Sequence, residues 1–360
     1  FDHDFQLAKE LHHNAHRFSI EWSRIEPTQN RFDDAAIEHY RQMIRSLKTR
    51  SIEPVVTLHH FTNPLWFHHE GGWLNNRSSI WFSRYAQRVV EALGQDVHYW
   101  VTINEPMVLV FYSYLTGVWP PGRKSVIQAW KAVQNLIRAH RAVYYKIHEI
   151  YAGHRWERPE VGLAKNLRPF HVCPQSQNFF CRLGVFLRHR LYNLYFLEKT
   201  KSMIDFIGAN YYEREYVSND RSSSFGLLGN NCNQAHHHSS HCNQMGWDYY
   251  PEGFFEVLCW LKKYRKPVLV TENGTCEEED EFRWRFIDEH LKQMGKAIKA
   301  GVPVIGYLYW SLLDNFEWHH GFDPRFGLIE VDYSTFQRTV RPSAFRLRDI
   351  IDAEEGGDGP

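Results

Sequence analysis

Short apolar runs alternate with longer amphipathic segments along the whole chain. Several of the runs are nearly continuous in Val, Ile and Leu, which is typical of parallel strands covered by helices on both faces. The pattern predicts strands at residues 14–22, 53–58, 99–104, 161–166, 205–210, 266–273 and 303–310.

Helical periodicity fills the segments between these runs. Asp33 or Asp34 would cap a helix whose apolar positions recur every three to four residues. Its apolar face is Ile37, Tyr40, Ile44 and Leu47, and the same spacing joins Phe82, Tyr85, Val89 and Leu93, and then Ile287, Leu291, Met294 and Ile298. Further helices are expected at 3–12, 125–150, 251–265 and 343–352.

Strands and helices that alternate without a linker predict one α/β domain over residues 1–360 with a parallel sheet. Residues 215–246 are the only long segment of low predicted order. A closed barrel of this class has eight strands, whereas the pattern gives seven after an opening helix. Either the sheet is open, or the first barrel strand is absent from this sequence.

Charge and composition exclude some classes of binding partner. Lys plus Arg (42) equal Asp plus Glu (42), so we expect no nucleic-acid partner and no membrane partner. No apolar run approaches the roughly 20 residues of a membrane-spanning helix. Aromatic residues make up 16% of the chain, with 13 Trp, which fits either an aromatic core or a cleft lined with stacking faces.

The six cysteines form no CxxC pair, so we expect free thiols in a reducing compartment and a cytoplasmic protein. Residues 232–242 hold two Cys and four His, but their spacing matches no common zinc pattern. We therefore expect a solvated loop and no metal. The acidic stretch 277–281 is expected to be a solvated loop or the start of a helix.

Polar, titratable and aromatic residues recur at one end of six predicted strands. Functional groups of a parallel barrel gather where strands end, so the joint pattern predicts a site, although any single member could be an ordinary polar group at a strand terminus. The residues are Arg17, His59, His60, Asn104, Glu105, Asn210, Tyr212, Glu272, Asn273 and Trp310, with Glu317 and Trp318 in the next loop.

Two carboxylates each follow an apolar strand and each touch an asparagine: Asn104-Glu105 and Glu272-Asn273. Glycoside cleavage needs one protonated carboxyl group that assists the leaving oxygen and one ionised carboxylate that attacks the anomeric carbon. Arg17, if it reaches Glu272, would favour the ionised form.

Other residues suit a sugar site. Tyr212 could donate a hydrogen bond to the nucleophilic carboxylate, and Asn104 could hold the sugar 2-hydroxyl. Trp310 and Trp318 offer stacking faces, while Glu317 and His60 could bind ring hydroxyls.

Eight stretches follow one another along the chain: "RFSIEWSRIEP" (17–27), "TLHHFTNPLW" (57–66), "GGWLN" (71–75), "TINEP" (102–106), "DFIGANYY" (205–212), "GWDYYPEG" (246–253), "VTENG" (270–274) and "WSLLDNFEWHHGFDPRFGLIEVD" (310–332). Together they resemble glycoside hydrolase family 1, the β-glucosidase family. The resemblance implies a (β/α)8 TIM barrel and a retaining mechanism without a cofactor.

The resemblance also implies roles. Glu105 matches the general acid/base and Glu272 the nucleophile. His60, Asn104, Trp310, Glu317 and Trp318 match residues that hold the glycone, and Phe326 matches an aromatic near the sugar. Arg17, Asn210 and Tyr212 match residues around the nucleophile that orient it.

The resemblance narrows the substrate to a small β-glycoside or oligosaccharide. Relatives that act on 6-phosphosugars typically lack the acidic residue matching Glu317, so a plain glucoside, galactoside or fucoside is expected. Plant thioglucosidases replace the acid/base Glu with Gln, so Glu105 favours an O-glycoside.

One departure leaves alternatives open. Family members normally begin with a strand carrying a glycone-binding Gln, and that strand is absent here, which matches the count of seven. Besides a β-glycosidase, the chain could be a carbohydrate-binding relative with weak or no turnover, or a truncated fragment.

Overall fold

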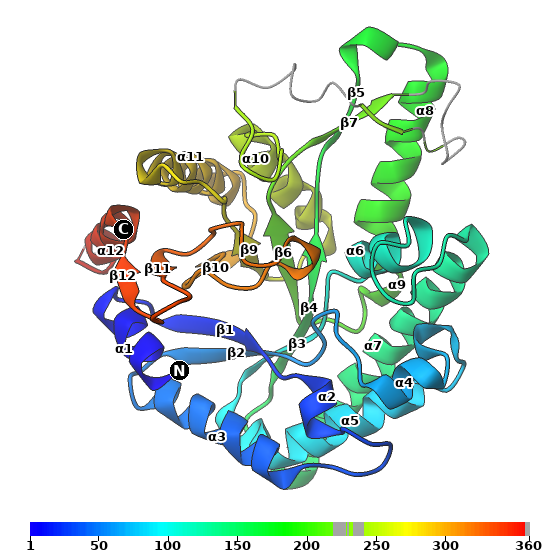
Figure 1. Cartoon of the computed structure of the whole chain (residues 1–360), viewed down its shortest axis with the longest axis vertical. Helices are drawn as coiled ribbons and strands as arrows, with labels where there is room; N and C mark the ends of the chain where they lie inside the picture. The colour runs from blue at the N-terminus through cyan, green and yellow to red at the C-terminus, as the bar shows by residue number, and fades with distance from the viewer. Residues whose placement is uncertain (219–227, 229, 233–240, 357–360) are drawn as a thin grey trace. The chain divides into compact units, whose positions relative to one another are not determined.

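The computed structural model describes residues 1–218, 228, 230–232 and 241–356. One seven-stranded sheet has the hydrogen-bonded order β1-β2-β3-β4-β6-β9-β10 (Figure 1). Its strands are β1 (Ala15–Ser19), β2 (Glu53–Thr57), β3 (Tyr99–Asn104), β4 (Glu160–Asn166), β6 (Phe206–Tyr211), β9 (Val268–Asn273) and β10 (Val304–Tyr309).

All seven predicted strands are confirmed, but β1 is shorter than predicted. The Glu21 side chain accepts a hydrogen bond from the backbone N–H of Ser23 and so caps a short helix, α2 (Trp22–Ile25). This cap ends the extended backbone before Trp22.

The chain forms two compact units, and each is described by itself. Unit 1 comprises Phe1–Asn166 and Phe196–Gly208, and unit 2 comprises Leu167–Tyr195 and Ala209–Pro360. The expectation that residues 1–360 act as one domain stays a prediction.

Unit 1 carries four parallel strands, β1 to β4, paired in sequence order. Its helices, besides α2, are α1 (Asp2–Glu10), α3 (Asp34–Lys48), α4 (Leu65–His69), α5 (Ser78–Leu93), α6 (Pro106–Val110), α7 (Val126–His154) and α9, which begins at the unit boundary (Tyr195–Thr200). Asp33 caps α3 as predicted, because its side chain accepts from the backbone N–H groups of Ala35 and Ala36. The predicted apolar faces of α3 and α5 are both buried.

Hydrogen-bonded polar side chains lie inside unit 1. His140 of α7 is fully buried, and its ring nitrogens contact Thr102 Oγ1 of β3 at 2.7 Å and the Met203 carbonyl at 2.7 Å. Burial lowers the pKa of His140 to about 4. The imidazole is therefore neutral at neutral pH and ties α7 to the sheet.

Unit 2 contains the end of β6 and the parallel pair β9 and β10. Its other elements are β5 (Phe170–Val172), α8 (Phe179–Arg188), β7 (Glu215–Ser218), β8 (Asn230–Asn231), α10 (Pro251–Leu261), α11 (Asp280–Lys299), β11 (Ile329–Val331), β12 (Arg338–Val340) and α12 (Pro342–Gly356). The prediction of low order for 215–246 is wrong in part, because β7 and β8 lie there in a small sheet, where β7 pairs with β5 and β8 pairs with β7.

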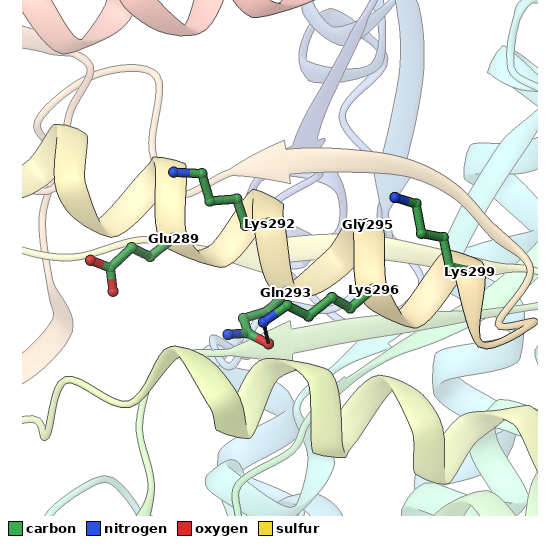
Figure 2. Close-up of a pocket in the computed structure, with 6 residues that line it drawn as sticks. All are labelled: Glu289, Lys292, Gln293, Gly295, Lys296 and Lys299. Atoms are coloured by element: carbon green, nitrogen blue, oxygen red, sulfur yellow. Dashed lines mark hydrogen bonds between the residues drawn. The ribbon is translucent and has the colours of Figure 1, made fainter.

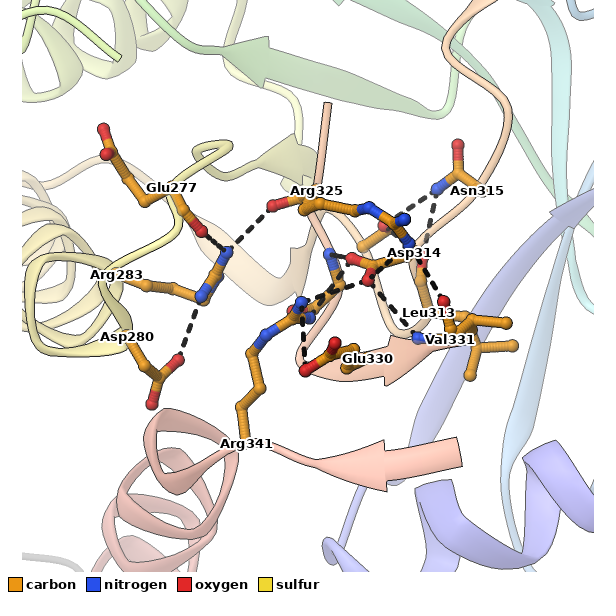
Figure 3. A network of polar contacts seen from close by, with 12 residues as sticks. Glu277, Asp280, Arg283, Leu313, Asp314, Asn315, Arg325, Glu330, Val331 and Arg341 are labelled. Atoms are coloured by element: carbon orange, nitrogen blue, oxygen red, sulfur yellow. Dashed lines mark hydrogen bonds and ion pairs between the residues drawn. The ribbon is translucent and has the colours of Figure 1, made fainter. Parts of the chain in front are cut away.

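The predicted apolar face of α11 is also wrong in part. Ile287 is buried, but Ile298 is 46% exposed, and the buried face includes the polar side chain of Arg283. Arg283 donates to Asp280 Oδ1 at 3.0 Å and to the carbonyls of Glu277 and Arg325, so this helix face needs a guanidinium (Figure 3).

The prediction for the acidic stretch 277–281 is also correct only in part. Asp280 begins α11, as expected for a helix start. Glu277, in contrast, is buried rather than solvated, and its Oε1 lies 2.9 Å from His241 Nε2. Burial raises the pKa of Glu277.

A bilayer-spanning helix would need roughly 20 apolar residues, and none of the helices within the described ranges meets that requirement.

Candidate active site

Eight of the predicted site residues lie in two clusters, one in each unit, and Trp310, Glu317 and Trp318 are described separately below. The Glu105 cluster of unit 1 comprises Arg17, His60, Asn104, Glu105 and Asn166. The Glu272 cluster of unit 2 comprises Asn210, Tyr212, Trp247, Glu272 and Phe326. Asn166 and Trp247 were not predicted from the sequence.

Glu105 follows β3 in a constrained backbone conformation. Its φ of 42° and ψ of 59° lie in the left-handed region, which costs free energy for a residue with a side chain. The backbone N–H donates to the Ala164 carbonyl at 2.8 Å, and Pro106 starts α6 directly afterwards. Local contacts therefore hold the carboxyl group at the end of the strand, where it is 6% exposed.

Asn166 fixes the orientation of this carboxyl group. Its side-chain amide donates to Glu105 Oε1 at 3.1 Å, and Asn166 is the last residue of β4. The sequence offered a signal, because β3, β4 and β9 all end in asparagine, but the polar end of the fourth strand was not included among the candidates.

Asn104 links Arg17 to His60. Arg17 Nη2 donates to Asn104 Oδ1 at 2.7 Å, and Arg17 Nε donates to Thr57 Oγ1 at 3.0 Å. A guanidinium only donates, so the oxygen of Asn104 faces Arg17 and its amide nitrogen faces His60 Nε2 at 3.0 Å. His60 Nε2 is then the acceptor, which places the ring proton on Nδ1.

His60 is neutral in this arrangement. Burial, supported by the positive charge of Arg17, holds the pKa of His60 well below its usual range. The adjacent His59 is different, since it is 1% exposed, bonds Asn63 Oδ1 at 3.1 Å and packs edge-on against Trp73. His59 is thus part of the core, which the "HH" pair in the sequence does not reveal.

Glu272 lies at the end of β9, one residue before the strand ends. It is 4% exposed, and the Tyr212 hydroxyl donates to its Oε2 at 2.6 Å. Asn210 accepts from Thr271 Oγ1 at 2.5 Å. Asn210 therefore bonds the residue next to Glu272 and fastens β6 to β9.

Aromatic rings hold Tyr212 in place. Its ring lies 5.1 Å from Trp247 and 6.3 Å from Phe326, measured between centroids, and those two rings lie 5.8 Å apart. Phe326 is 1% exposed, so the structure places it as a support for Tyr212. Its contact with a sugar stays a prediction.

Gly274 brings the end of β9 close to the end of β10. A Cβ atom at Gly274 would lie 1.8 Å from the Trp310 carbonyl oxygen, which no side chain can accommodate. The Trp310 N–H also donates to the Asn273 carbonyl at 3.0 Å. This close backbone approach positions Trp310 beside the Glu272 strand.

The loop that carries Glu317 and Trp318 is built around Asp314 (Figure 3). Asp314 is 4% exposed and accepts from the Gly327 N–H at 2.8 Å and from the Arg341 guanidinium at 3.1 and 3.0 Å. Asp314 and Arg341 were missed from the sequence, because their pairing spans residues far apart in the chain.

A hollow of about 550 Å³ along α11 contains none of the predicted site residues (Figure 2). Its lining includes Glu289, Lys292, Lys296 and Lys299.

All six cysteines are free thiols, as predicted. Within the described ranges, no three His, Cys, Asp or Glu side chains gather as a metal site. Residues 233–240 of the Cys/His-rich stretch lie outside the described residues.

Comparisons with known proteins agree on one family. The family model described as "Glycosyl hydrolase family 1" matches residues 1–180 and 188–356. The 1,4-beta-D-glucan glucohydrolase of Thermotoga neapolitana is 30% identical over 384 residues, covering 97% of this chain and 85% of the relative.

Solved structures agree with that assignment. A beta-glycosidase from Pyrococcus horikoshii superimposes with a TM-score of 0.87 and 38% identity, covering 97% of this chain and 82% of that one. The beta-glucosidase from Thermotoga maritima in complex with glucoimidazole gives a TM-score of 0.88 and 29% identity, covering 98% and 86%. The predicted TIM-barrel fold is thereby confirmed. The chain belongs to glycosyl hydrolase family 1 and is a β-glycosidase.

Proposed function

We propose that this β-glycosidase cleaves small O-linked β-glycosides with retention of configuration, with both units acting as one catalytic domain. Glu272 is the nucleophile and Glu105 the general acid/base. One observation supports the proposal most: each carboxyl group is buried at a strand end and receives a hydrogen bond from a neutral donor.

The donor to Glu272 suits a nucleophile. A hydroxyl that donates to a carboxylate stabilises the ionised form. Ionised Glu272 attacks the anomeric carbon and forms a glycosyl ester, while Glu105 gives its proton to the departing glycosidic oxygen. The electron pair of the broken C–O bond stays on that oxygen.

Glu105 then acts as a base. As a carboxylate it takes a proton from water, the water oxygen bonds the anomeric carbon, and the ester bond to Glu272 breaks. The Asn166 amide keeps the carboxyl group in one orientation through both steps.

The remaining residues are proposed to hold the substrate. His60 offers its Nδ1–H to a sugar hydroxyl, Asn104 binds the 2-hydroxyl, and Glu317 accepts from ring hydroxyls. Trp310, Trp318 and Phe326 surround the ring with aromatic faces, and Arg17 and Asn210 orient the nucleophile. The negative charge of Glu317 would repel a phosphorylated sugar, so neutral glucosides, galactosides and fucosides are the proposed substrates.

Hydrolysis of nitrophenyl β-glucoside, β-galactoside and β-fucoside tests the proposal, with Glu272→Gln and, as a control, Glu289→Gln at a half-buried carboxylate of α11. We expect turnover in the parent and the control and none in Glu272→Gln. The first-formed product should be the β-anomer by proton NMR, and a slow 2-fluoro glycoside should leave its sugar on the peptide that carries Glu272.

Sugar binding without turnover in a cooperatively melting chain would favour the carbohydrate-binding alternative. An α-anomeric first product would indicate inversion. Wild-type rates in Glu272→Gln would exclude this residue as the nucleophile.

A further inference from the structure

Helix α8 exposes a cluster of aromatic side chains. Phe179, Phe180 and Phe186 are 72%, 53% and 59% exposed, and Leu191, just beyond the helix, is 39% exposed. Single exposed apolar residues are ordinary, but several on one short helix indicate a contact surface. We call this set, with Arg182 and Arg190, the α8 face.

The opposite side of α8 is firmly packed against unit 2. Cys181 and Gly184 are buried, and a Cβ atom at Gly184 would lie 3.1 Å from the Leu228 carbonyl oxygen. Arg188 donates to that same carbonyl at 2.8 Å and to Asn231 Oδ1 at 2.7 Å. The exposed phenylalanines therefore cannot turn inward without displacing these contacts.

Helical geometry gathers the exposed side chains. At 100° per residue, Phe179 and Phe186 point within about 20° of each other and Arg182 points about 40° from Phe186, whereas Phe180 points about 100° from Phe179. Arg190 lies in the π-helical turn that follows α8. In Figure 1, α8 stands beside β5 and β7. The α8 face is thus a ridge of rings and guanidinium groups.

The charge of this segment differs from that of the whole chain. Residues 179–197 contain Arg182, Arg188 and Arg190 and no Asp or Glu, although the chain is neutral overall. Arg188 is ion-paired with Glu215, so Arg182 and Arg190 carry the local excess. Arg182 and Arg190 are exposed, and neither forms an ion pair with any residue in the described ranges. The expectation of no membrane partner rested on the neutral total, which conceals this local excess.

The family match leaves out the middle of this helix, because its two matched segments end at residue 180 and resume at residue 188.

We propose that the α8 face docks on an anionic lipid surface. Phe179, Phe180 and Phe186 enter the boundary between headgroups and acyl chains, and Arg182 and Arg190 meet lipid phosphates. A short helix with aromatic and cationic side chains on one face has the chemistry of an interfacial anchor.

The same features disfavour a second copy of this chain as the occupant. A two-fold interface sets one patch against itself. The four arginines of the two copies would then lie in one interface, with no acidic residue between 179 and 197 to neutralise them.

Co-sedimentation of the full chain with lipid vesicles tests the proposal. We expect binding to vesicles of phosphatidylcholine mixed with phosphatidylglycerol, and weak binding to phosphatidylcholine alone. The triple variant Phe179→Ser/Phe180→Ser/Phe186→Ser should lower the partition coefficient by about tenfold or more. Arg182→Gln/Arg190→Gln should lower it less and reduce its salt dependence.

Helix α11 supplies a control, because Lys292, Lys296 and Lys299 lie along it (Figure 2). The variant Lys292→Gln/Lys296→Gln/Lys299→Gln removes more positive charge than the arginine variant and should leave vesicle binding near the parent level. Hydrolysis and thermal melting should be unchanged in all variants.

Three outcomes would overturn the proposal. The first is that the parent does not bind the mixed vesicles. The second is that the α11 variant loses as much binding as the phenylalanine variant. The third is that the parent is a dimer that the phenylalanine changes dissociate, with no vesicle binding. If the triple variant fails to melt cooperatively, the double change Phe179→Ser/Phe186→Ser carries the test.

Discussion

The two clusters hold their carboxyl groups by different means. Glu105 owes its position to its own strained backbone and to one amide, whereas Glu272 sits in a regular strand under a tyrosine clamped by two rings. A group that must give and take a proton needs orientation more than a fixed charge, and a nucleophile needs a stabilised charge. The difference between the clusters matches the different tasks proposed for them.

Low pH is expected to have the largest effect, because it lowers the free energy of unfolding of the two units to different extents. Burial lowers the pKa of His59 and His140 in unit 1 to about 4, and of His290 in unit 2 to about 3. Each folded pKa lies below the unfolded value of about 6.5, so the stabilisation is complete above pH 6.5 and is lost as the pH falls towards 4. At pH 4, each of these histidines is expected to lower the free energy of unfolding by about 3 kcal/mol.

Unit 1 holds two of these three histidines, so it should open first. Hydrogen exchange followed by mass spectrometry between neutral pH and pH 4 measures the order of opening. Earlier exchange in α10 and α11 of unit 2 than in α5 and α7 of unit 1 would contradict this.

Removing the proposed acid is the next largest change. Glu105→Ala should slow hydrolysis of substrates with poor leaving groups by about 10³-fold. Dinitrophenyl glycosides, which leave without a proton, should lose far less in the first step. Glu91→Ala, an exposed carboxylate of unit 1, is the control and should match the parent. Equal losses for both leaving groups would rule out Glu105 as the acid.

Tyr212→Phe tests how much the hydrogen bond to Glu272 contributes to the reaction. It removes the hydroxyl that donates to Glu272 but keeps the ring against Trp247. A lost hydrogen bond to a charged group corresponds to about tenfold to hundredfold in kcat/KM.

Tyr250→Phe is the matched control for this change, because the Tyr250 hydroxyl donates to Glu256 at 2.8 Å and not to Glu272. A loss of kcat/KM of the same size in both variants would assign the effect to general loosening of unit 2.

Asn166→Ala is expected to have the smallest effect, about twofold to tenfold in kcat/KM. The basic limb of the pH profile should move upward, since the amide stabilises ionised Glu105. Asn63→Ala, which removes an amide bonded to His59, should leave that limb in place. An unchanged basic limb in Asn166→Ala would mean that the amide does not act on Glu105.

Strand periodicity was sufficient to predict the seven strands and most of the side chains at their ends. The supporting residues escaped prediction because their roles depend on contacts between distant segments. Asp314 and Arg341 lie 27 residues apart, and Trp247 supports Tyr212 from another loop. Asn166 is an exception, since it ends a predicted strand and the rule that found Asn104 applies to it as well.

Helix α11 shows a second limit of periodicity. The apolar spacing predicted which residues repeat along the helix, but the buried face was set by Arg283 and the carbonyls it must satisfy. A long polar side chain can occupy a core position when its donors are paired, and spacing alone does not detect this.

The close packing at Gly274 limits which residues can change as the sequence evolves. Its identity is imposed by the Trp310 backbone, which leaves no room for a methyl group, whereas the identity of Glu272 is required only by the proposed chemistry. A descendant that no longer cleaved sugars would be free to replace Glu272 but not Gly274. In the "ENG" stretch of such a descendant, the glycine would therefore be kept after activity was lost, and a change at the glutamate would be the sign of that loss.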